Sequence, residues 1–541
     1  MIRELVIHNF KGILDADILL NKERNILVGN NGVGKSTVIE ALSLVLGYGL
    51  NQLEILPSLF NIQSVAKFEE DKVPPEIIIE VYFDDEEAQG ANAVFSGKNN
   101  TKHQYAFGIQ LKIVFDEEQF SDIYELEKAD IHEIPCEYYK VERNWFSDTK
   151  VVQRLIPYNV LLVDSTSNYF NANSNQYISN LIQKYLGDKE TIKIKSGLRR
   201  LKDTFDGNED LEKINSEISK QRKDLSISID LSSHIITRNI ICPYLDKIPV
   251  SQIGAGDLCV LKTMLTLDKT HLNDKKRIVI IEEPESHLSH TKMYELINEI
   301  NGKVDNVNTQ LVITTHNNFV ANKLNLSNVI LLNNEKGKVI SSRITDNAEL
   351  GKYFTKISNY PTLRLILCRA AILVEGPADE MVVTYYYHKK YGVHPFEHSI
   401  ELISVEGVKF KAFVELAKNC HKMVAVVTDN DGIASEEGLI KERGLGDLPD
   451  NIKLFTDADH KNCTTLEPSL VHANHDKWES LAKIVRKQNV KDDSQEKLID
   501  FMTGNKTEWA YRLLESVDDS DITVPKYIAD AVDWIEKEHE Q

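Results

Sequence analysis

The sequence predicts an α/β protein of more than one domain, and three stretches of it lead to this prediction. In the first, ILVGNNGVGKST (26–37), a glycine-rich loop joins an apolar strand to a helical pattern. The second, IVIIEEPE (278–285), is a β-branched strand that ends in acidic residues. In the third, which begins near residue 370, short apolar strands alternate with helices, as they do around a parallel sheet. A chain of 541 residues is also too long for one small core.

The glycine-rich loop predicts a nucleotide site. Residues 29–36, GNNGVGKS, match the phosphate-binding pattern GxxxxGK[ST] at every fixed position, with the required strand before them and helix after them. The glycines let backbone N–H groups face a phosphate, and the start of the helix adds its positive end. We expect Lys35 to reach the outer phosphates and Ser36 to hold Mg²⁺. The alternative, a glycine-rich turn with a stray lysine, is disfavoured because every fixed position matches. The predicted nucleotide-binding residues are Asn30, Asn31, Gly32, Gly34, Lys35, Ser36, Thr37 and, from a later strand, Glu282.

Composition narrows the function classes. The formal net charge of −20 weakens the case for broad electrostatic binding of nucleic acid, but it permits a local basic channel or acidic clusters neutralised by metal ions. No apolar run reaches the roughly 18–20 residues that span a membrane, and residues 1–12 alternate like a strand. We therefore expect a cytoplasmic protein without a membrane partner. The six cysteines have no paired spacing and predict neither a zinc site nor disulfides.

In chain order, residues 2–8 and 13–20 predict an opening hairpin, residues 76–83 and 105–115 antiparallel strands, and residues 159–164 a further strand. From 165 to 231 the chain becomes polar and carries helical patterns at 177–186 and 211–225. We interpret 165–231 as a helical insertion that mediates oligomerisation. The alternative is a two-helix excursion that only covers the core.

Further nucleotide chemistry is predicted after the insertion. SQIGAGD (251–257) precedes an apolar helix at 258–267, and the strand 278–281 ends in two carboxylates. Glu282 can hold Mg²⁺ through water, and Glu283 can polarise an attacking water. The strand 310–314 is followed by His316, which we expect to sense the γ-phosphate, although a lone histidine at a strand end is commonly structural.

Together, GNNGVGKST, SQIGAGD, IVIIEEPESHL and LVITTHNNF resemble the ABC-type ATPase of the SMC-like and OLD (overcoming lysogenisation defect) group, over roughly residues 1–350. The resemblance implies an ATP-binding head in two parts, 1–164 and 232–360, around the insertion. A glutamine that often contacts the metal in such ATPases has only Gln52 and Gln63 as candidates here. Glu282 stands where many ABC proteins have Asp, and Asp257 stands where Gln is common. These departures put fast ATP turnover in doubt more than ATP binding.

Acidic residues follow the later strands. Glu375 comes directly after strand 371–374, and Asp379 lies one helical turn further on. Asp429 and Asp431 follow strand 423–427, where strand spacing would point both the same way. Convergent carboxylates need a cation, and hard oxygen ligands favour Mg²⁺ or Mn²⁺. Two such ions can clamp the attacking and leaving oxygens of a phosphodiester. The alternative is that these acids cap helices and form turns.

VEGPADE and VTDNDG resemble a Toprim domain, which we place at 361–541. The resemblance implies the metal ligands Glu375, Asp379, Asp429 and Asp431, with Glu380 and Glu467 as further ligands and Thr428 as a supporting hydroxyl. It also implies a basic residue that stabilises the pentavalent phosphorus. Lys506 is the candidate, with an ordinary loop lysine as the alternative.

An ABC-type ATPase followed by a Toprim domain is the order of OLD-family nucleases. The resemblance implies an ABC/SMC-like head with a helical insertion and then a Toprim α/β domain, acting as an ATP-controlled, Mg²⁺- or Mn²⁺-dependent DNA endonuclease in anti-phage defence. The implied partners are DNA, a homodimer or higher homo-oligomer, and a helicase or reverse-transcriptase component. The alternative is an ATP-switched DNA clamp or tether without cleavage activity. A topoisomerase or primase is disfavoured, because zinc spacing is absent and Tyr385–Tyr387 predict helix packing.

Overall fold

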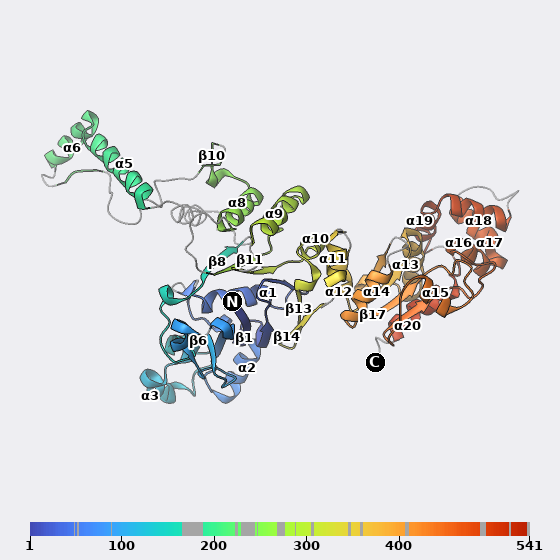
Figure 1. Ribbon diagram of the computed structural model, residues 1–541, viewed down its shortest axis with the longest axis horizontal. Helices are drawn as coiled ribbons and strands as arrows, with labels where there is room; N and C mark the ends of the chain where they lie inside the picture. Colours follow the sequence, from blue (N-terminus) through green and yellow to red (C-terminus); the bar gives the residue numbers. More distant parts are fainter. Residues whose placement is uncertain are drawn as a thin grey trace. The chain divides into compact units, whose positions relative to one another are not determined.

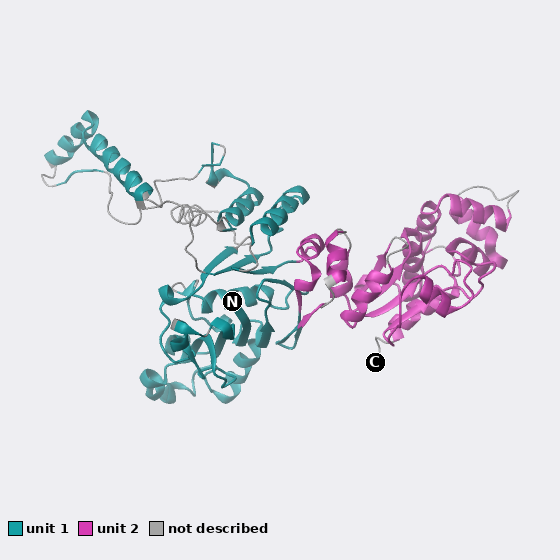
Figure 2. Cartoon of the chain, viewed as in Figure 1, with its two compact units in different colours: residues 1–315, 332–341 teal, residues 316–331, 342–541 magenta. Residues whose placement is uncertain are grey.

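The computed structural model separates the chain into two compact units (Figure 2). The first contains Met1–Thr315 and Leu332–Ser341, and the second contains His316–Leu331 and Ser342–Gln541. The residues that the structure describes are 1–47, 49–50, 53–87, 89–164, 188–221, 225–228, 244–245, 247–267, 276–286, 288–304, 308–344, 348–356, 361–405, 410–486, 494–518 and 521–537.

A sheet of 12 strands forms the centre of the first unit (Figure 1). Its order is β5-β6-β4-β1-β2-β14-β13-β3-β12-β11-β8, with β7 paired to β6. The predicted hairpin and antiparallel strands are confirmed at one end of this order. The strands are β1 (Ile2–Phe10), β2 (Ile13–Leu19), β3 (Arg24–Val28), β4 (Ile77–Phe83), β5 (Ser96–Gly97), β6 (Ala106–Phe115), β7 (Tyr139–Trp145), β8 (Asn159–Asp164), β11 (Arg277–Glu282), β12 (Thr309–Thr314), β13 (Val329–Glu335) and β14 (Lys338–Arg343), and the pair β9 (Tyr244–Leu245) and β10 (Ile248–Pro249) stands apart.

The other end of the sheet is parallel and positions the nucleotide motifs. β8, β11, β12 and β3 run in the same direction, and Glu282 lies opposite both Thr314 and Asp164. Thr314 in turn lies opposite Leu27, so these strands end at one level. The β-branched side chains of β11 are fully buried, which is why the strand reads as a continuous apolar run.

The helix that follows β11 is α9, which begins at His290. The hydroxyl of the preceding Ser289 accepts the Lys292 N–H. The predicted helix at 211–225 is observed as α6, whereas the one at 177–186 lies outside the described residues. The helices are α1 (Lys35–Val45), α2 (Ile62–Asp71), α3 (Glu117–Glu127), α5 (Asp188–Asp206), α6 (Glu209–Gln221), α8 (Ala255–Leu267) and α9 (His290–Lys303).

The second unit is built on a four-stranded sheet in which every pairing is parallel, as predicted, with the order β16-β15-β17-β18. Its strands are β15 (Ala370–Val374), β16 (Ile400–Ser404), β17 (Met423–Val427) and β18 (Ile452–Phe455). Its helices are α10 (Asn318–Lys323), α11 (Ala348–Lys356), α12 (Thr362–Leu367), α13 (Pro377–Tyr391), α14 (Phe410–Asn419), α15 (Glu436–Glu442), α16 (Leu466–Ala473), α17 (Trp478–Arg486), α18 (Gln495–Gly504), α19 (Glu508–Glu515) and α20 (Lys526–Lys537).

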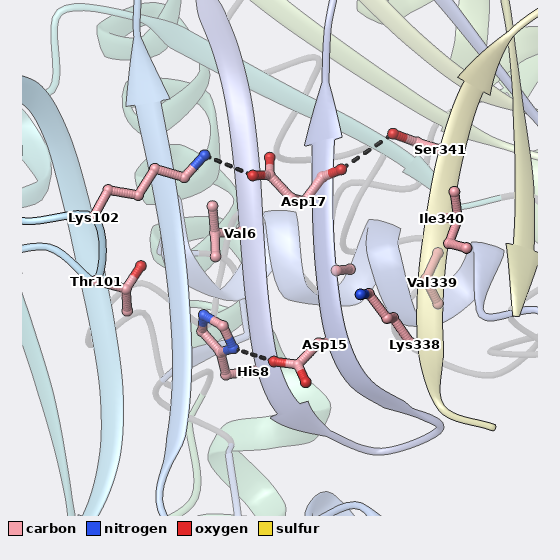
Figure 3. A pocket seen from close by; sticks show the side chains of 11 residues that line it. Val6, His8, Asp15, Asp17, Thr101, Lys102, Lys338, Val339, Ile340 and Ser341 are labelled. Atoms are coloured by element: carbon pink, nitrogen blue, oxygen red, sulfur yellow. Dashed lines mark hydrogen bonds and ion pairs between the residues drawn. The ribbon is translucent and has the colours of Figure 1, made fainter. Parts of the chain in front are cut away.

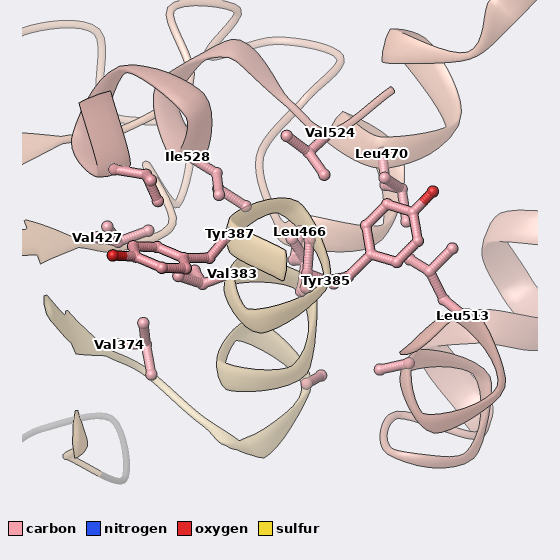
Figure 4. Packing of buried hydrophobic residues seen from close by; sticks show 14 of the residues in the cluster. Val374, Val383, Tyr385, Tyr387, Val427, Leu466, Leu470, Leu513, Val524 and Ile528 are labelled. Atoms are coloured by element: carbon pink, nitrogen blue, oxygen red, sulfur yellow. The ribbon is translucent and has the colours of Figure 1, made fainter. Parts of the chain in front are cut away.

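Helix α13 lies at the centre of the apolar core of the second unit (Figure 4). Tyr385 and Tyr387 are fully buried among aliphatic side chains from α16, α19, α20 and the sheet, which confirms that they pack a helix. Val374 and Val427, the last residues of two adjacent strands, belong to the same core. This packing fixes the strand ends from which the acidic residues project. Among the described helices, none has the length and apolar character needed to cross a membrane.

Candidate nucleotide and metal sites

The phosphate loop connects β3 to α1 and depends on left-handed backbone at two glycines. Gly32 has φ +81° and Gly34 has φ +103°, a region that side chains disfavour. α1 begins at Lys35, which is only 6% exposed. The ammonium of Lys35 donates to the Gly29 carbonyl at 2.8 Å and to the Asn30 carbonyl at 3.0 Å. Asn30, Asn31, Gly32 and Ser36 are exposed, so the loop keeps an outer face that can receive phosphate oxygens.

Carboxylates that follow β11 act electrostatically on the same lysine. Burial lowers the pKa of Lys35, and the negative charges of Glu283 and Glu285 oppose this shift. Glu283 has φ +41°, which is unusual for a residue with a side chain. Its N–H donates to the Thr314 carbonyl at 3.1 Å, which ties the strained residue to the next strand. Predicted Glu283 is therefore brought close to predicted Lys35.

The remaining residues near this site include one that was not predicted from the sequence and three that were. Sequence reasoning missed Glu285, which accepts a hydrogen bond from the Thr315 hydroxyl at 2.6 Å; as the last acid of EEPE it was visible in the motif. Gln63 donates to the Lys336 carbonyl at 2.6 Å, and Gln52 lies outside the described residues. His316 is exposed and is the first residue of the second unit, so its role stays a prediction.

A separate hollow of about 470 Å³ lies over β1, β2 and β14 of the first unit (Figure 3). Two pairs of its polar side chains are in contact: His8 Nδ1 lies 2.5 Å from Asp15 Oδ1, and Lys102 Nζ lies 2.6 Å from Asp17 Oδ2, while Lys338 also lines the hollow. None of the predicted nucleotide-binding residues lines it. The hollow is therefore distinct from the predicted nucleotide site.

In the second unit, acidic residues gather at the carboxyl edge of the parallel sheet, where open α/β sheets bind their ligands. Glu375 follows β15, and Asp379 lies on the first turn of α13 with 8% exposure. Asp429 follows β17, and Glu467 lies on the first turn of α16 with 6% exposure. We call Glu375, Asp379, Asp429 and Glu467 the acidic cluster.

The acidic cluster is electrostatically unfavourable without a cation. Burial, and then the charge of Glu375, raise the pKa of Asp379 to about 7. Burial, followed by Glu375, Asp379, Glu467 and Asp431, raises the pKa of Asp429 to about 8. These shifts have the direction expected for carboxylates that share one desolvated site.

Hydrogen bonds orient two members of the cluster. The Thr428 hydroxyl donates to Glu375, and the Asp429 N–H donates to Glu375 Oε1 at 3.1 Å. The Gly376 N–H donates to Asp379 Oδ2 at 3.1 Å, so Asp379 also caps the start of α13. Asp379 therefore caps a helix, as the alternative interpretation of the sequence stated, and it also belongs to the acidic cluster.

The donor set fits a hard divalent cation, because all its members are carboxylates, and burial together with the neighbouring negative charges raises the pKa of two of them. Within the part of the chain that the structure describes, no three acidic, histidine or cysteine side chains already converge as metal ligands. The site thus has the charge and chemistry for Mg²⁺ or Mn²⁺, while its side chains must close further around an ion.

Sequence reasoning missed two residues at this edge. The Arg443 guanidinium donates to Glu375 Oε1 at 2.8 Å and to Asp431 Oδ2 at 2.7 Å. The buried Tyr527 of α20 also lies here: burial, and then Asp429, Asp379, Asp457 and Glu375, raise the pKa of its hydroxyl well above the usual value. Neither residue belongs to a motif, because the fold brings each back from a distant element.

Two predicted residues are placed differently from expectation, and the role of a third is untested. The prediction that Asp429 and Asp431 share strand spacing is wrong, since β17 ends at Val427 and Asp431 has φ +48° with its side chain 54% exposed. Burial raises the pKa of Glu380, and the charges that act on it are those of Arg364 and Glu401 rather than those of the acidic cluster. One residue along a helix is a rotation of about 100°, so Glu380 faces away from Asp379. Lys506 is exposed between α18 and α19, and its role stays a prediction.

Comparisons with known proteins give two family matches. Residues 24–322, more than half of the chain, match the family described as "AAA domain, putative AbiEii toxin, Type IV TA system". Residues 366–431 match the family described as "Overcoming lysogenization defect protein-like, TOPRIM domain". A comparison with curated proteins finds no match.

Solved structures give weaker similarities. An SMC head bound to the C-terminal winged-helix domain of ScpA is 14% identical, with a TM-score of 0.33, and the match covers 63% of this chain and 98% of that one. The SMC head domain from Thermotoga maritima is 11% identical, with a TM-score of 0.30 and coverage of 64% and 99%. The C-terminal region of the Burkholderia pseudomallei OLD protein is 19% identical, with a TM-score of 0.25 and coverage of 32% and 98%.

Replacing Lys35 with alanine should weaken ATP binding by at least about 100-fold, because it removes the charge-assisted bonds to the outer phosphates. Isothermal titration of the full chain with ATP and Mg²⁺ measures this. Lys67→Ala, which removes an exposed lysine of α2, is the matched control and should bind normally. Unchanged nucleotide affinity in Lys35→Ala would refute the phosphate-loop assignment.

The raised pKa of Asp429 also predicts a pH dependence of stability. In the unfolded chain its carboxyl titrates near 3.8, whereas in the folded protein it titrates at about 8. Between these values the folded state holds a proton that the unfolded state has lost, so stability falls as pH rises. Asp429→Asn should therefore raise the melting temperature of metal-free protein, and the gain should grow from about pH 5 to about pH 8.

Thermal unfolding in the presence of a chelator measures this gain. The exposed Asp450→Asn serves as the control and should show no such trend. A gain for Asp429→Asn that is constant across pH would contradict the burial argument.

Proposed function

Because the chain belongs to the AAA-domain family matched by residues 24–322 and carries an OLD-like Toprim domain, we propose that it is a metal-dependent DNA endonuclease controlled by its ATPase. The observation that carries the proposal is the acidic cluster, in which two buried aspartates with raised pKa values lie beside Glu375 at the carboxyl edge of a parallel sheet. Burying such a cluster is unfavourable in free energy unless the carboxylates bind a cation.

In this proposal, the side chains that would hold Mg²⁺ or Mn²⁺ are Glu375, Asp379, Asp429, Asp431 and Glu467. Metal held there would provide polarisation of the scissile phosphate and activation of a water. Thr428 orients Glu375 through its hydroxyl, and the Asp429 N–H fixes the same carboxylate from a second direction. Buried apolar side chains under the strand ends hold both donors rigidly in place.

The nucleotide site is proposed to bind ATP with one Mg²⁺. Lys35 would exchange its loop carbonyls for phosphate oxygens, and Ser36 and Glu282 would hold the ion. Glu283 would polarise the attacking water, and this is supported by its backbone φ of +41°, since strained residues often lie at functional positions. His316 would sense the γ-phosphate. ATP binding would then govern how two heads pair, and turnover would be slow.

The domain assignment follows from these sites. We propose an ATPase in two parts, 1–164 and 232–360, a dimerising insertion at 165–231 and a nuclease domain at 361–541.

DNA is the proposed substrate, and the proposed setting is anti-phage defence in the cytoplasm, with a helicase or reverse-transcriptase component as a further partner. The insertion is supported by apolar side chains that α5 and α6 leave exposed, including Ile192, Leu201, Phe205 and Ile214.

Asp429→Ala should abolish cleavage of supercoiled plasmid in Mg²⁺ or Mn²⁺ while ATP hydrolysis remains nearly unchanged, because the two sites belong to different units. Gel analysis of nicked and linear products, with and without ATP, gives the activity and the direction of its control. Asp450→Ala removes an exposed carboxylate of the same unit and should cleave like the wild type.

Loss of both activities in a folded Asp429→Ala protein would contradict two separate sites. Absence of cleavage by the wild type under every condition, with ATP binding intact, would instead favour the ATP-switched clamp or tether.

Replacing residues 165–231 with a short glycine–serine linker should lower the oligomeric mass, because it removes the exposed apolar side chains of α5 and α6. Light scattering coupled to size exclusion measures the mass of the full chain and of the variant. An unchanged mass would show that these helices only cover the core.

A further inference from the structure

We propose that Arg443 is a built-in counter-cation of the acidic cluster, which competes with the divalent metal for Glu375 and Asp431 and must leave them when the metal binds. The inference rests on the proposed metal site and assigns to it a residue that no motif contains. According to this inference, the guanidinium of Arg443 lowers the affinity of the site for metal.

The contacts of Arg443 carry the inference. One guanidinium nitrogen, Nη2, lies 2.8 Å from Glu375 Oε1 and 2.7 Å from Asp431 Oδ2, and it approaches the Asp429 carbonyl at 3.4 Å. A single positive nitrogen thus bridges two proposed ligands from different strand ends, as a metal ion would. The arginine side chain is only 17% exposed, so solvent screens these contacts incompletely.

Arg443 is incompletely satisfied where it lies. Its buried Nε has no hydrogen-bond partner among the described residues. Arginine has five donors, and a structural ion pair usually uses the planar fork with both nitrogens on one carboxylate. Here the fork is not used in that way, which makes the contact easier to exchange than a bidentate pair.

The backbone at Arg443 is fixed, so the exchange needs only side-chain rotation. The Arg443 N–H donates to the Leu439 carbonyl at 2.9 Å, and the Leu445 N–H donates to the Ile440 carbonyl at 3.0 Å. Gly444 has φ +64°, which lets the chain reverse directly after the arginine, and Leu445 is fully buried. A long side chain on a fixed helix end can leave the carboxylates without any movement of the sheet.

The charge balance gives the sign of the effect. Four carboxylates of the cluster and Asp431 share one edge, and Arg443 is the cation in hydrogen-bond contact with them among the described residues. Removing this positive charge leaves the carboxylates more negative, so a divalent ion should bind more tightly. If Arg443 instead only organised the ligands, its removal would weaken metal binding.

The test measures metal binding to the full chain without nucleotide or DNA. Chelator-stripped protein is titrated with Mn²⁺, and free Mn²⁺ is followed by its electron paramagnetic resonance signal. Arg443→Gln should bind Mn²⁺ about tenfold more tightly than the wild type. Arg443→Lys, which keeps the charge, should lie near the wild type. The control Arg364→Gln breaks an arginine pair with Glu401 in the same unit and should leave the affinity unchanged.

Unchanged or weaker Mn²⁺ binding by Arg443→Gln would overturn the inference while leaving the metal site in place. Binding that Asp429→Ala does not reduce, or no binding at all, would overturn the proposed metal site and the inference with it.

A second measurement uses the wild type and does not depend on the folding of a variant. Phenylglyoxal modifies accessible guanidinium groups, and mass spectrometry reads each arginine separately. Mn²⁺ should increase the modification of Arg443 several-fold by releasing it from Glu375 and Asp431, while Arg364 stays unchanged. Protection of Arg443 by Mn²⁺ would contradict the exchange.

Discussion

The burial of mutually repelling carboxylates at one edge of a parallel sheet is the constraint on which the chemistry of the second unit depends. β15 and β17 are adjacent and parallel, so Glu375 and Asp429 must leave the sheet at the same edge. The pKa values of Asp379, about 7, and of Asp429, about 8, express the electrostatic cost of this arrangement. A fold that selection shaped only for stability would not bury these groups together, and Arg443 compensates them only in part.

The first unit uses the same geometry with the opposite charge at its centre. β3, β12 and β11 are parallel, and their ends bring a buried lysine, a glycine-rich loop and the acids of EEPE to one level. Lys35 is enclosed by its own loop carbonyls, and Glu283 and Glu285 support its charge. Both units therefore derive their chemistry from parallel strands, although one presents a cation to an anionic ligand and the other presents anions to a cation.

Most of the fold could be predicted from the sequence, because the informative signals are local. A β-branched run such as 278–281 can hardly be anything except a buried strand, and GNNGVGKS specifies its own strand, loop and helix. The site was less predictable wherever local geometry departs from regular structure. Asp431 lies in a left-handed turn after the end of β17 instead of at strand spacing from Asp429, and Glu380 follows the rotation of α13 rather than its sequence neighbour.

Arg443 and Tyr527 show the other limit, since their positions depend on long-range packing. Arg443 reaches Glu375 only because β17 and α15 return it to the edge of β15, and Tyr527 arrives on the last helix of the chain. The reaction determines which residues must serve as metal ligands in the motifs. Distant residues such as Arg443 and Tyr527 can change the charge of the site without altering those ligands. A cation placed among the ligands lets the chain set how readily its site takes up metal, and an arginine suits this role because it keeps its charge at every pH at which the carboxylates titrate.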